Sequence, residues 1–333
     1  MVEVSDTAKR TATGFANANI AFIKYWGNRD HELRIPSNGS ISMNLDGLFT
    51  RTRVTFDQTS AQDELIIQGQ AQNGPALQRV SALLNRVRSM AEMNCWARVV
   101  SSNNFPMGAG IASSASAFAA LSLAASRAAG LDLDEAALSR LARTGSGSAC
   151  RSVPAGFVEW RGGDRHENSY AYSIAPPEHW ALVDCVAIVS REHKATGSTE
   201  GHPLAHTSPL QAARLDDAPR RLGICRKVIL ERDFEALAEI VELDSNIMHG
   251  VIMTSNPRIL YWLPATLAVM QNVAAWRAAG LPVCYTIDAG PNVHVICTAA
   301  YAGQVAESLK ALPGVESVLT ATPGGPARIV DEL

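Results

Sequence analysis

The pattern of apolar and polar residues along the chain predicts strands in its first third. Alternation of the two kinds of residue predicts strands at residues 40–45, 51–56, 64–67 and 97–101. Helical spacing at residues 75–93 predicts one helix, and an alanine-rich run that ends near Gly130 predicts another. A further helix follows Asp132 or Asp134, because either carboxylate can cap its first turn.

The remainder of the chain predicts helices between two groups of strands. Strands return at residues 156–160, 180–190, 284–287 and 293–297, and the last two form a hairpin. Three helices occupy residues 208–280, with breaks near Arg232 and at 255–257. The tail predicts a helix at 302–312 and short strands flanking 323–326.

This partial segregation of strands and helices predicts an α+β fold of two lobes more than a doubly wound sheet. We expect the boundary near residue 190, which gives an N-terminal lobe of residues 1–190 and a C-terminal lobe of residues 191–333.

Composition and charge narrow the class of protein. The chain has 333 residues, of which 47% are hydrophobic and 18% charged, as expected for a well-packed globular protein. Its formal net charge of −3 provides no basic field for nucleic acid or an anionic membrane. An anionic small substrate would therefore need positive groups within its own site.

Cysteine usage and the termini indicate a soluble cytoplasmic enzyme. The six cysteines lack C-x-x-C pairs and zinc-type spacing, so we expect buried, reduced thiols. Residues 1–10 are polar and lack the apolar core of a signal peptide. The most apolar stretch, residues 111–130, contains five serines and Arg127 and is a poor membrane span.

A Gly/Ser-rich segment at residues 108–116 is the first candidate site. Gly108 and Gly110 let the backbone approach a ligand closely, and Ser113, Ser114 and Ser116 add hydroxyls. The helix that follows directs its free N–H groups and the positive end of its dipole at this point, which suits phosphate. The alternative is an ordinary Gly/Ser-rich helix start, because neither the dinucleotide fingerprint nor the Walker loop is matched.

Three more segments have candidate chemistry. Ser146, Ser148 and Arg151 share one tight turn and can hold a carboxylate or phosphate, unless this is a surface turn with a solvated arginine. Lys24 lies in an apolar stretch and needs an anionic partner, unless its ammonium group reaches solvent. Asp288 follows an apolar run and is a candidate general base, although Asp-x-Gly is also ordinary turn chemistry.

Together these segments resemble the mevalonate diphosphate decarboxylases, a branch of the GHMP small-molecule kinase superfamily. The matching stretches occur in family order over nearly the whole chain: residues 18–27, 36–42, 104–106, 110–116, 145–152, 156–160, 197–201, 207–208, 244–246 and 288–292. The Lys-Tyr-Trp-Gly and Gly-Ser-Gly-Ser-Ala-Cys-Arg motifs are the most specific of them.

The resemblance implies a fold and a nucleotide site. The N-terminal lobe would resemble ribosomal protein S5 domain 2, the C-terminal lobe would be ferredoxin-like, and the active site would lie in the cleft between them. ATP would bind with Mg²⁺, whose ligands the sequence does not identify. The expected ATP contacts are Pro106, Gly108, Gly110, Ser113, Ser114, Ser116 and, from a looser match, Lys194.

The resemblance also implies catalytic and substrate-binding roles. Asp288 would take or orient the proton of the substrate's 3-hydroxyl, and Lys24 would lie near that carboxylate and the transferred phosphoryl group. Arg151, with Ser146 and Ser148, would hold the substrate's carboxylate and distal phosphate. The expected substrate contacts are Asn19, Tyr25, Asn28, Ser146, Ser148 and Arg151.

One departure from the family pattern directs the choice of substrate. Members of the family usually have a second lysine where this chain has Asn28, and that lysine meets the substrate's diphosphate. Loss of a charge-assisted contact costs about 1.5–3 kcal/mol, and a monophosphate would suffer less. We therefore expect decarboxylation of mevalonate 5-phosphate to isopentenyl phosphate in a variant mevalonate pathway, although Arg29 next door can compensate.

Two other activities stay open at this point. One is decarboxylation of mevalonate 5-diphosphate to isopentenyl diphosphate, and the other is a mevalonate 3-kinase that phosphorylates without decarboxylation. A homodimer is expected by analogy with the family.

Overall fold

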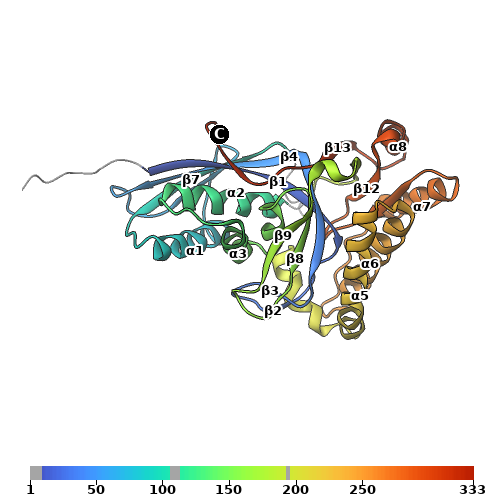
Figure 1. Cartoon of the computed structure of the whole chain (residues 1–333), viewed down its shortest axis with the longest axis horizontal. Coiled ribbons are helices and arrows are strands. Elements are labelled where there is room, and N and C mark those ends of the chain that lie inside the picture. Colours follow the sequence, from blue (N-terminus) through green and yellow to red (C-terminus); the bar gives the residue numbers. More distant parts are fainter. Residues whose placement is uncertain (1–9, 106–112, 193–195) are drawn as a thin grey trace, which may run out of the picture.

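One large sheet runs through the molecule and joins strands from both ends of the chain. The structure is a computed structural model that describes residues 10–105, 113–192 and 196–333. Within these residues the sheet has 12 strands, with the main order β11-β12-β10-β13-β4-β7-β5-β6, while β1, β14, β8 and β9 attach to its sides. Helices α1 to α3 lie at one end of the molecule and α5 to α8 at the other (Figure 1).

The strands differ greatly in length. Their bounds are β1 (Arg10–Ile23), β2 (Asn28–Asp30), β3 (Ile35–Pro36), β4 (Ser40–Asp57), β5 (Glu64–Ile67), β6 (Gln70–Gln72), β7 (Trp96–Asn103), β8 (Phe157–Arg161), β9 (Tyr170–Ala175), β10 (Leu182–Ile188), β11 (Val283–Thr286), β12 (Val293–Thr298), β13 (Ser317–Pro323) and β14 (Arg328–Val330). Strands β2 and β3 pair with each other away from the large sheet.

The helices are mainly α-helices, with short 3₁₀ turns between them. The α-helices are α1 (Pro75–Met90), α2 (Ser113–Ala128), α3 (Glu135–Gly145), α4 (Ser198–Gly201), α5 (Gln211–Glu231), α6 (Phe234–Thr254), α7 (Pro264–Ala278) and α8 (Ala302–Lys310). The 3₁₀ helices are η1 (Gly147–Ser152), η2 (Pro177–His179), η3 (His202–Thr207) and η4 (Ala299–Tyr301).

The two longest strands form the centre of the sheet and differ from the prediction. The predicted strands 40–45 and 51–56 are parts of the single strand β4, which pairs antiparallel with β1. The register shifts after Asn17, opposite Gly47, whose φ of 90° suits glycine. The alternation rule did not predict β1, because nearly all of it is buried on both faces and alanine and asparagine are frequent in it.

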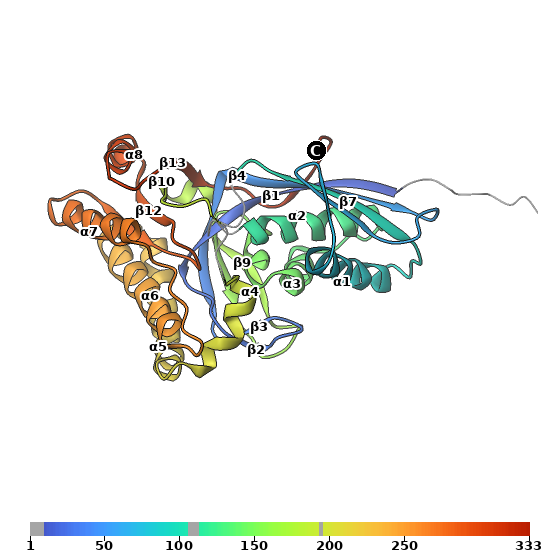
Figure 2. The same ribbon diagram turned by 180° about the vertical axis from the view of Figure 1, so that it is seen from behind.

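Three apolar clusters hold the helices against this sheet. Helices α1 to α3 pack on β1, β4 and β7 through a cluster that includes Leu83, Phe118 and Leu141. Helices α5 and α6 pack on β1, β4 and β10 in another, and α7 and α8 cover β10 to β12 in a third. Figure 2 shows helices α5, α6 and α7 from the side opposite to that of Figure 1. The burial of these faces is the main favourable term in folding.

Most predicted elements are confirmed, and one open choice is decided. Asp134 caps α3, because its Oδ1 accepts the Ala137 N–H at 2.6 Å. Asp132 instead pairs with Arg127. The helical region breaks at Arg232, which has a left-handed φ of 58°. Strands β11 and β12 form the predicted antiparallel hairpin.

The tail of the chain adds two strands to the sheet at different places. Strand β13 pairs with β10 and β4, whereas β14 pairs with β1, so the last strand lies beside the first (Figure 1). The boundary at residue 190 stays a prediction.

The structure also bears on two predictions from composition. All six cysteines are free thiols, five of them buried and Cys95 half-buried. Over the described ranges, no helix combines the length and the apolar character needed to cross a membrane.

The contact between β1 and α2 yields a stability prediction. A Cβ atom at Gly14 would collide with the backbone carbonyl of Ala120, whereas one at Gly223 in α5 would meet open space. We expect Gly14→Ala to lower the free energy of unfolding by about 1–3 kcal/mol, because two backbones must move apart. Gly223→Ala should raise it by about 0.4–1 kcal/mol through the unfolded chain. Urea unfolding of both variants checks this, and equal midpoints would contradict it.

Candidate active site

A cavity of about 410 Å³ lies where the two groups of helices meet the sheet. It is bordered by the end of β1, the start of α2, η1, α4 and the loop between β11 and β12. Eight of the predicted site residues line it: Lys24, Tyr25, Ser113, Ser114, Ser146, Ser148, Arg151 and Asp288. The sequence therefore predicted much of one site from segments that are far apart in the chain.

A buried ion pair lies at the base of this cavity. Lys24 Nζ donates to Asp288 Oδ1 at 2.5 Å, and the lysine side chain is 1% exposed against 24% for the aspartate. Burial lowers the pKa of Lys24 below its usual value, although the Asp288 and Asp244 carboxylates oppose this. Burial would raise the pKa of Asp288, but the charges of Lys24, His294 and Arg151 hold it below its usual value. Asp288 is therefore an ionised acceptor at neutral pH.

The Arg151 guanidinium lies at the cavity wall, and two hydrogen bonds hold it in place. Its Nη1 donates to Ser40 Oγ at 2.6 Å and its Nη2 to Asn19 Oδ1 at 3.2 Å. Asn19 in turn donates to Ser152 Oγ at 2.8 Å. Asn19 is buried and does not line the cavity, so the structure places it against Arg151. Its predicted contact with substrate stays a prediction.

The serine-rich segments meet at the start of α2. Ser114 Oγ and Ser146 Oγ are 3.0 Å apart, so the two predicted loops form one hydroxyl-lined wall. The first turn of α2 adds its positive dipole end and its free N–H groups. Ser116 differs, since its buried hydroxyl contacts Thr50 Oγ1 at 2.7 Å and does not line the cavity.

Some predicted ATP contacts lie outside the described residues. These are Pro106, Gly108, Gly110 and Lys194.

Tyr25 closes the side of the cavity near η1. Its ring stacks on His202, with ring centroids 4.1 Å apart, and it fills the space that a side chain at Gly147 would need. Its hydroxyl donates to Asn28 Oδ1. Burial raises the pKa of the Tyr25 phenol, so it stays protonated. Asn28 itself does not line the cavity.

Two arginines that the sequence analysis did not single out also line the cavity. Arg34 Nε donates to the Thr144 carbonyl at 3.2 Å, and Arg79 Nη2 donates to the Gly145 carbonyl at 3.0 Å. No carboxylate in residues 10–105, 113–192 or 196–333 lies within ion-pair distance of either. Burial, together with the charge of Arg34, lowers the pKa of Arg79 to about 10, so Arg79 stays a cation at neutral pH.

Signals for both arginines were present in the sequence. Arg34 lies between Leu33 and Ile35, as Lys24 lies in an apolar run. Arg79 lies four residues before the first of two buried leucines of α1, at helical spacing from the face that packs inward.

A smaller, mainly apolar slot of about 190 Å³ adjoins the cavity. It shares Arg79, Ser113 and Ser114 with the cavity, and Leu65, Val99 and Leu121 line its interior. An apolar slot that opens onto hydroxyls and a guanidinium can hold a flat ring system with an anionic tail.

Comparison with known proteins agrees with this arrangement. The family model described as the diphosphomevalonate decarboxylase-like N-terminal domain matches residues 16–171. The model of the mevalonate 5-diphosphate decarboxylase C-terminal domain matches residues 185–325. The diphosphomevalonate decarboxylase of Aspergillus fumigatus is 38% identical to this chain over an alignment of 336 residues. The alignment covers 94% of this chain and 83% of the relative. The chain belongs to the diphosphomevalonate decarboxylase family.

Further relatives and solved structures agree. The human diphosphomevalonate decarboxylase is 36% identical over 87% of this chain and 78% of its own. The structure of the mevalonate diphosphate decarboxylase from Enterococcus faecalis has a TM-score of 0.90 at 35% identity and covers 98% of this chain and 100% of its own. A complex of MDDEF with MVAPP, AMPPCP and magnesium has a TM-score of 0.91 at 36% identity, with the same coverage.

Membership of the family confirms two of the expectations. The fold is the two-lobed α+β fold of the GHMP kinase superfamily, to which these decarboxylases belong. The protein is an enzyme, an ATP-dependent decarboxylase of the mevalonate pathway.

The expected preference for mevalonate 5-phosphate is wrong. Both family models and the relatives described above are those of diphosphomevalonate decarboxylases. The preference depended on a neutral Asn28 in place of a lysine. Asn28 lies behind Tyr25 and outside the cavity lining, whereas Arg34 and Arg79 supply cations within it. Counting charge at a single motif position therefore underestimated the positive charge of the site.

The two arginines yield a binding prediction for this decarboxylase. Inorganic pyrophosphate should raise the midpoint of thermal unfolding, because a ligand that binds the folded state stabilises it. Arg34→Gln and Arg79→Gln should each reduce this shift, since a charge-assisted hydrogen bond is worth about 1.5–3 kcal/mol. Differential scanning fluorimetry measures the shifts. Arg98→Gln, whose side chain is exposed and paired with Glu64, is the control. An undiminished shift in both cavity variants would exclude this site for pyrophosphate.

Proposed function

We propose that the enzyme decarboxylates mevalonate 5-diphosphate with ATP, giving isopentenyl diphosphate, ADP, phosphate and CO₂. The main support is the set of four cationic side chains around one cavity, Lys24, Arg34, Arg79 and Arg151. The substrate and ATP both have several negative charges, and groups held in place at such charges stabilise the transition state of phosphoryl transfer.

The first chemical step would transfer the γ-phosphoryl group of ATP to the 3-hydroxyl. A tertiary hydroxyl is a poor leaving group, and phosphorylation makes it a good one. Asp288, ionised and paired with Lys24, would accept or orient the hydroxyl proton. The Lys24 ammonium, on the other side of the carboxylate, would offset negative charge on the transferred group.

The second step would break the bond between the carboxylate carbon and its neighbour. The 3-phosphate leaves with its bonding electrons, C3 becomes positive, and the electrons of the breaking C–C bond form the alkene as CO₂ departs. Arg151 would hold the carboxylate in line with this bond, a matter of orientation. Its fixed position, held by Ser40 and Asn19, supports that role.

The carboxylate and the diphosphate of the substrate would bind at different walls of the cavity. Arg34 and Arg79, with Tyr25, Ser146 and Ser148, would hold the diphosphate. Asn28 would then affect the substrate through Tyr25, whose hydroxyl group donates a hydrogen bond to Asn28 Oδ1.

ATP would extend from the apolar slot to the start of α2. The adenine ring would lie against Leu65 and Val99, and the phosphates would meet Ser113 and Ser114. The predicted contacts Pro106, Gly108, Gly110 and Lys194 remain part of this proposal, whereas Ser116 does not, because its buried hydroxyl contacts Thr50.

Mg²⁺ would accompany the nucleotide. Oxygen atoms of the kind that Mg²⁺ prefers are present at the cavity wall in Ser114 and Glu200, which fits an ion carried mainly by phosphates and water. When bound, the ion would neutralise charge on the phosphates.

A substrate assay tests the proposal directly. The purified protein is incubated with Mg-ATP and, separately, mevalonate, its 5-phosphate and its 5-diphosphate, while ADP and CO₂ are recorded together. We expect equal amounts of ADP and CO₂ from the diphosphate, and at least about tenfold lower kcat/KM with the monophosphate, because one doubly contacted phosphate is missing. ADP without CO₂ would make the protein a kinase and overturn the proposal.

The general base yields a second test. Asp288→Asn should lower kcat for CO₂ release by about 10²–10⁴, because the amide cannot take the hydroxyl proton. Asp132→Asn, in an exposed ion pair with Arg127, is the control and should keep the activity. Circular dichroism and thermal unfolding verify that both variants fold. Near-full turnover by Asp288→Asn would remove Asp288 from the mechanism.

The expected homodimer and cytoplasmic location complete the proposal. They rest on the resemblance and on composition, and light scattering after size-exclusion chromatography tests the first.

A further inference from the structure

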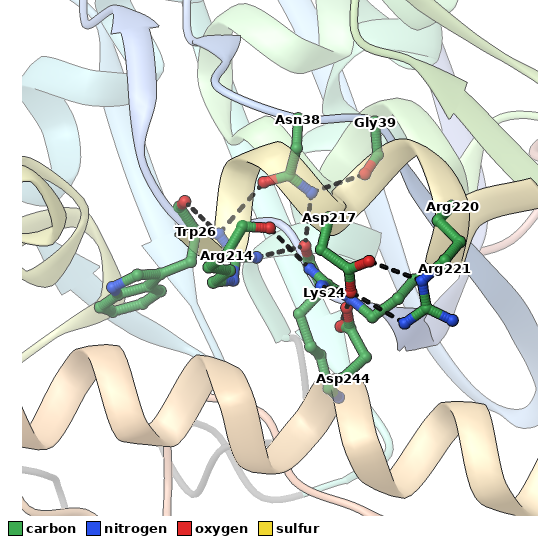
Figure 3. Close-up of polar contacts among 9 residues, drawn as sticks. All are labelled: Lys24, Trp26, Asn38, Gly39, Arg214, Asp217, Arg220, Arg221 and Asp244. Carbon is green, nitrogen blue, oxygen red and sulfur yellow. Dashed lines mark hydrogen bonds and ion pairs between the residues drawn. The ribbon is translucent and has the colours of Figure 1, made fainter. Parts of the chain in front are cut away.

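The segment that follows β1 is irregular, buried and directly attached to the proposed catalytic lysine. Residues 24–27 have no strand partner, yet Lys24 and Trp26 are almost completely buried. A buried backbone N–H or C=O group without a partner costs free energy, so other groups must satisfy this segment. They come from helices α5 and α6 and from the loop before β4, as Figure 3 shows for Lys24 and Trp26.

Asp244 on α6 satisfies the first of these groups. Its Oδ2 accepts the backbone N–H of Lys24 at 2.6 Å, and its Oδ1 accepts Arg221 Nε at 2.7 Å. Asp244 and Arg221 are both fully buried. Arg221 also pairs with Asp217 at 2.6 Å (Figure 3). Because the Asp217 side chain is partly exposed, the network reaches solvent at this residue.

Arg214 on α5 satisfies the carbonyl groups. Its Nη2 donates to the Lys24 carbonyl at 2.8 Å and its Nη1 to the Trp26 carbonyl at 3.0 Å. Asn38 donates to the Lys24 carbonyl at 3.0 Å and accepts from Arg214 Nη1 at 3.2 Å. The fork of one buried guanidinium therefore binds the carbonyl groups of the two residues that flank Tyr25, a geometry that lysine cannot reproduce.

These contacts fix the backbone on both sides of the Lys24 side chain. We propose that Asp244 and Arg214 are positioning residues that hold Lys24 Nζ against Asp288, an inference that rests on the catalytic role proposed for Lys24. Neither residue lines the cavity, and each acts through the backbone from which the ammonium group extends.

Asp244 has a second, electrostatic effect. The charged and titratable groups that face Lys24 are Asp288 from the hairpin loop, Asp244 and His249 from α6, and Arg151 from η1. Asp244 favours the ammonium form of Lys24, whereas burial and Arg151 disfavour it. Loss of the Asp244 charge should therefore lower the pKa of Lys24 further, and catalysis should fail at a lower pH on the alkaline side.

A merely structural role for Asp244 would give a different result, and the chain offers a matched control. Arg226, further along α5, forms a two-bond ion pair with the buried carboxylate of Glu159, with both N···O distances 2.6 Å. This pair also ties α5 to another element, the strand β8, but it does not contact residues 24–27. Glu159→Gln should lower stability as Asp244→Asn does, without affecting Lys24.

Lysine titration by NMR tests the inference without any assay of activity. The sequence has five lysines, so a protein labelled with ¹³C at the lysine ε-carbon gives few signals, and Lys24→Arg identifies that of Lys24. In Asp244→Asn the titration midpoint of Lys24 should fall by about one pH unit or more, since a carboxylate charge near it is lost. In Glu159→Gln it should not move. An unmoved midpoint in Asp244→Asn would overturn the electrostatic part.

Arg214→Lys tests positioning, and it also serves if Asp244→Asn does not fold. Lysine keeps the buried charge but cannot bridge both carbonyls, so kcat should fall about tenfold or more because the ammonium is misplaced. KM for ATP should change less than about threefold, because Arg214 lies outside the cavity. Wild-type kcat in folded Arg214→Lys would overturn the inference. Failure of the wild-type enzyme to release CO₂ would instead refute the proposed function, and the Lys24 titration would still decide the electrostatic part.

Discussion

The ion pair between the buried Lys24 and the partly buried Asp288, at the base of one cavity, imposes the main constraint on this structure. Removing Lys24 and Asp288 from water is costly, and only close pairing with further hydrogen bonds offsets that cost. The two residues are 264 positions apart in the chain. The end of β1 and the turn of the β11–β12 hairpin must therefore be held in place together. Helix α6 contacts both regions, because its Asp244 accepts the Lys24 N–H and its Ser245 accepts the Ile287 N–H. Helix α5 holds the end of β1 through Arg214, which donates to the Lys24 carbonyl.

The sequence predicted the elements whose residues have a clear period or a clear stop. The break at Arg232, the cap before α3 and the hairpin around Asp288 are examples, because caps and turns leave local signals. It did not predict β1, which is buried on both faces and so lacks alternation. Nor could it predict that Ser116 turns away from Ser113 and Ser114 to contact Thr50, because the direction of a hydroxyl depends on the tertiary partner.

The motifs predicted which residues come together at the site, but the comparison of charge at one motif position gave the wrong substrate. Lys24, Arg151 and Asp288 come together as the motifs indicated, although their roles stay predictions. The substrate was misjudged because Asn28 was compared with a lysine at the same position, as if one position supplied the charge. Electrostatic potential adds over all nearby groups, and Arg34 and Arg79 reach the same cavity from other elements. A change of charge at one position therefore defines specificity only once the neighbours in space are known.

The pairing of the first and last strands has a consequence for the order of folding during synthesis. Strand β14 pairs with β1 through residues 13–15, and the Arg328 guanidinium lies 3.9 Å above the Phe15 ring. The ribosome releases the N-terminal half long before Arg328 exists. During that time this edge of β1 has no partner strand. An unpaired edge can pair with other chains unless chaperones or the nascent chain itself cover it. This edge of the sheet is therefore closed only after residues 328–330 have been synthesised.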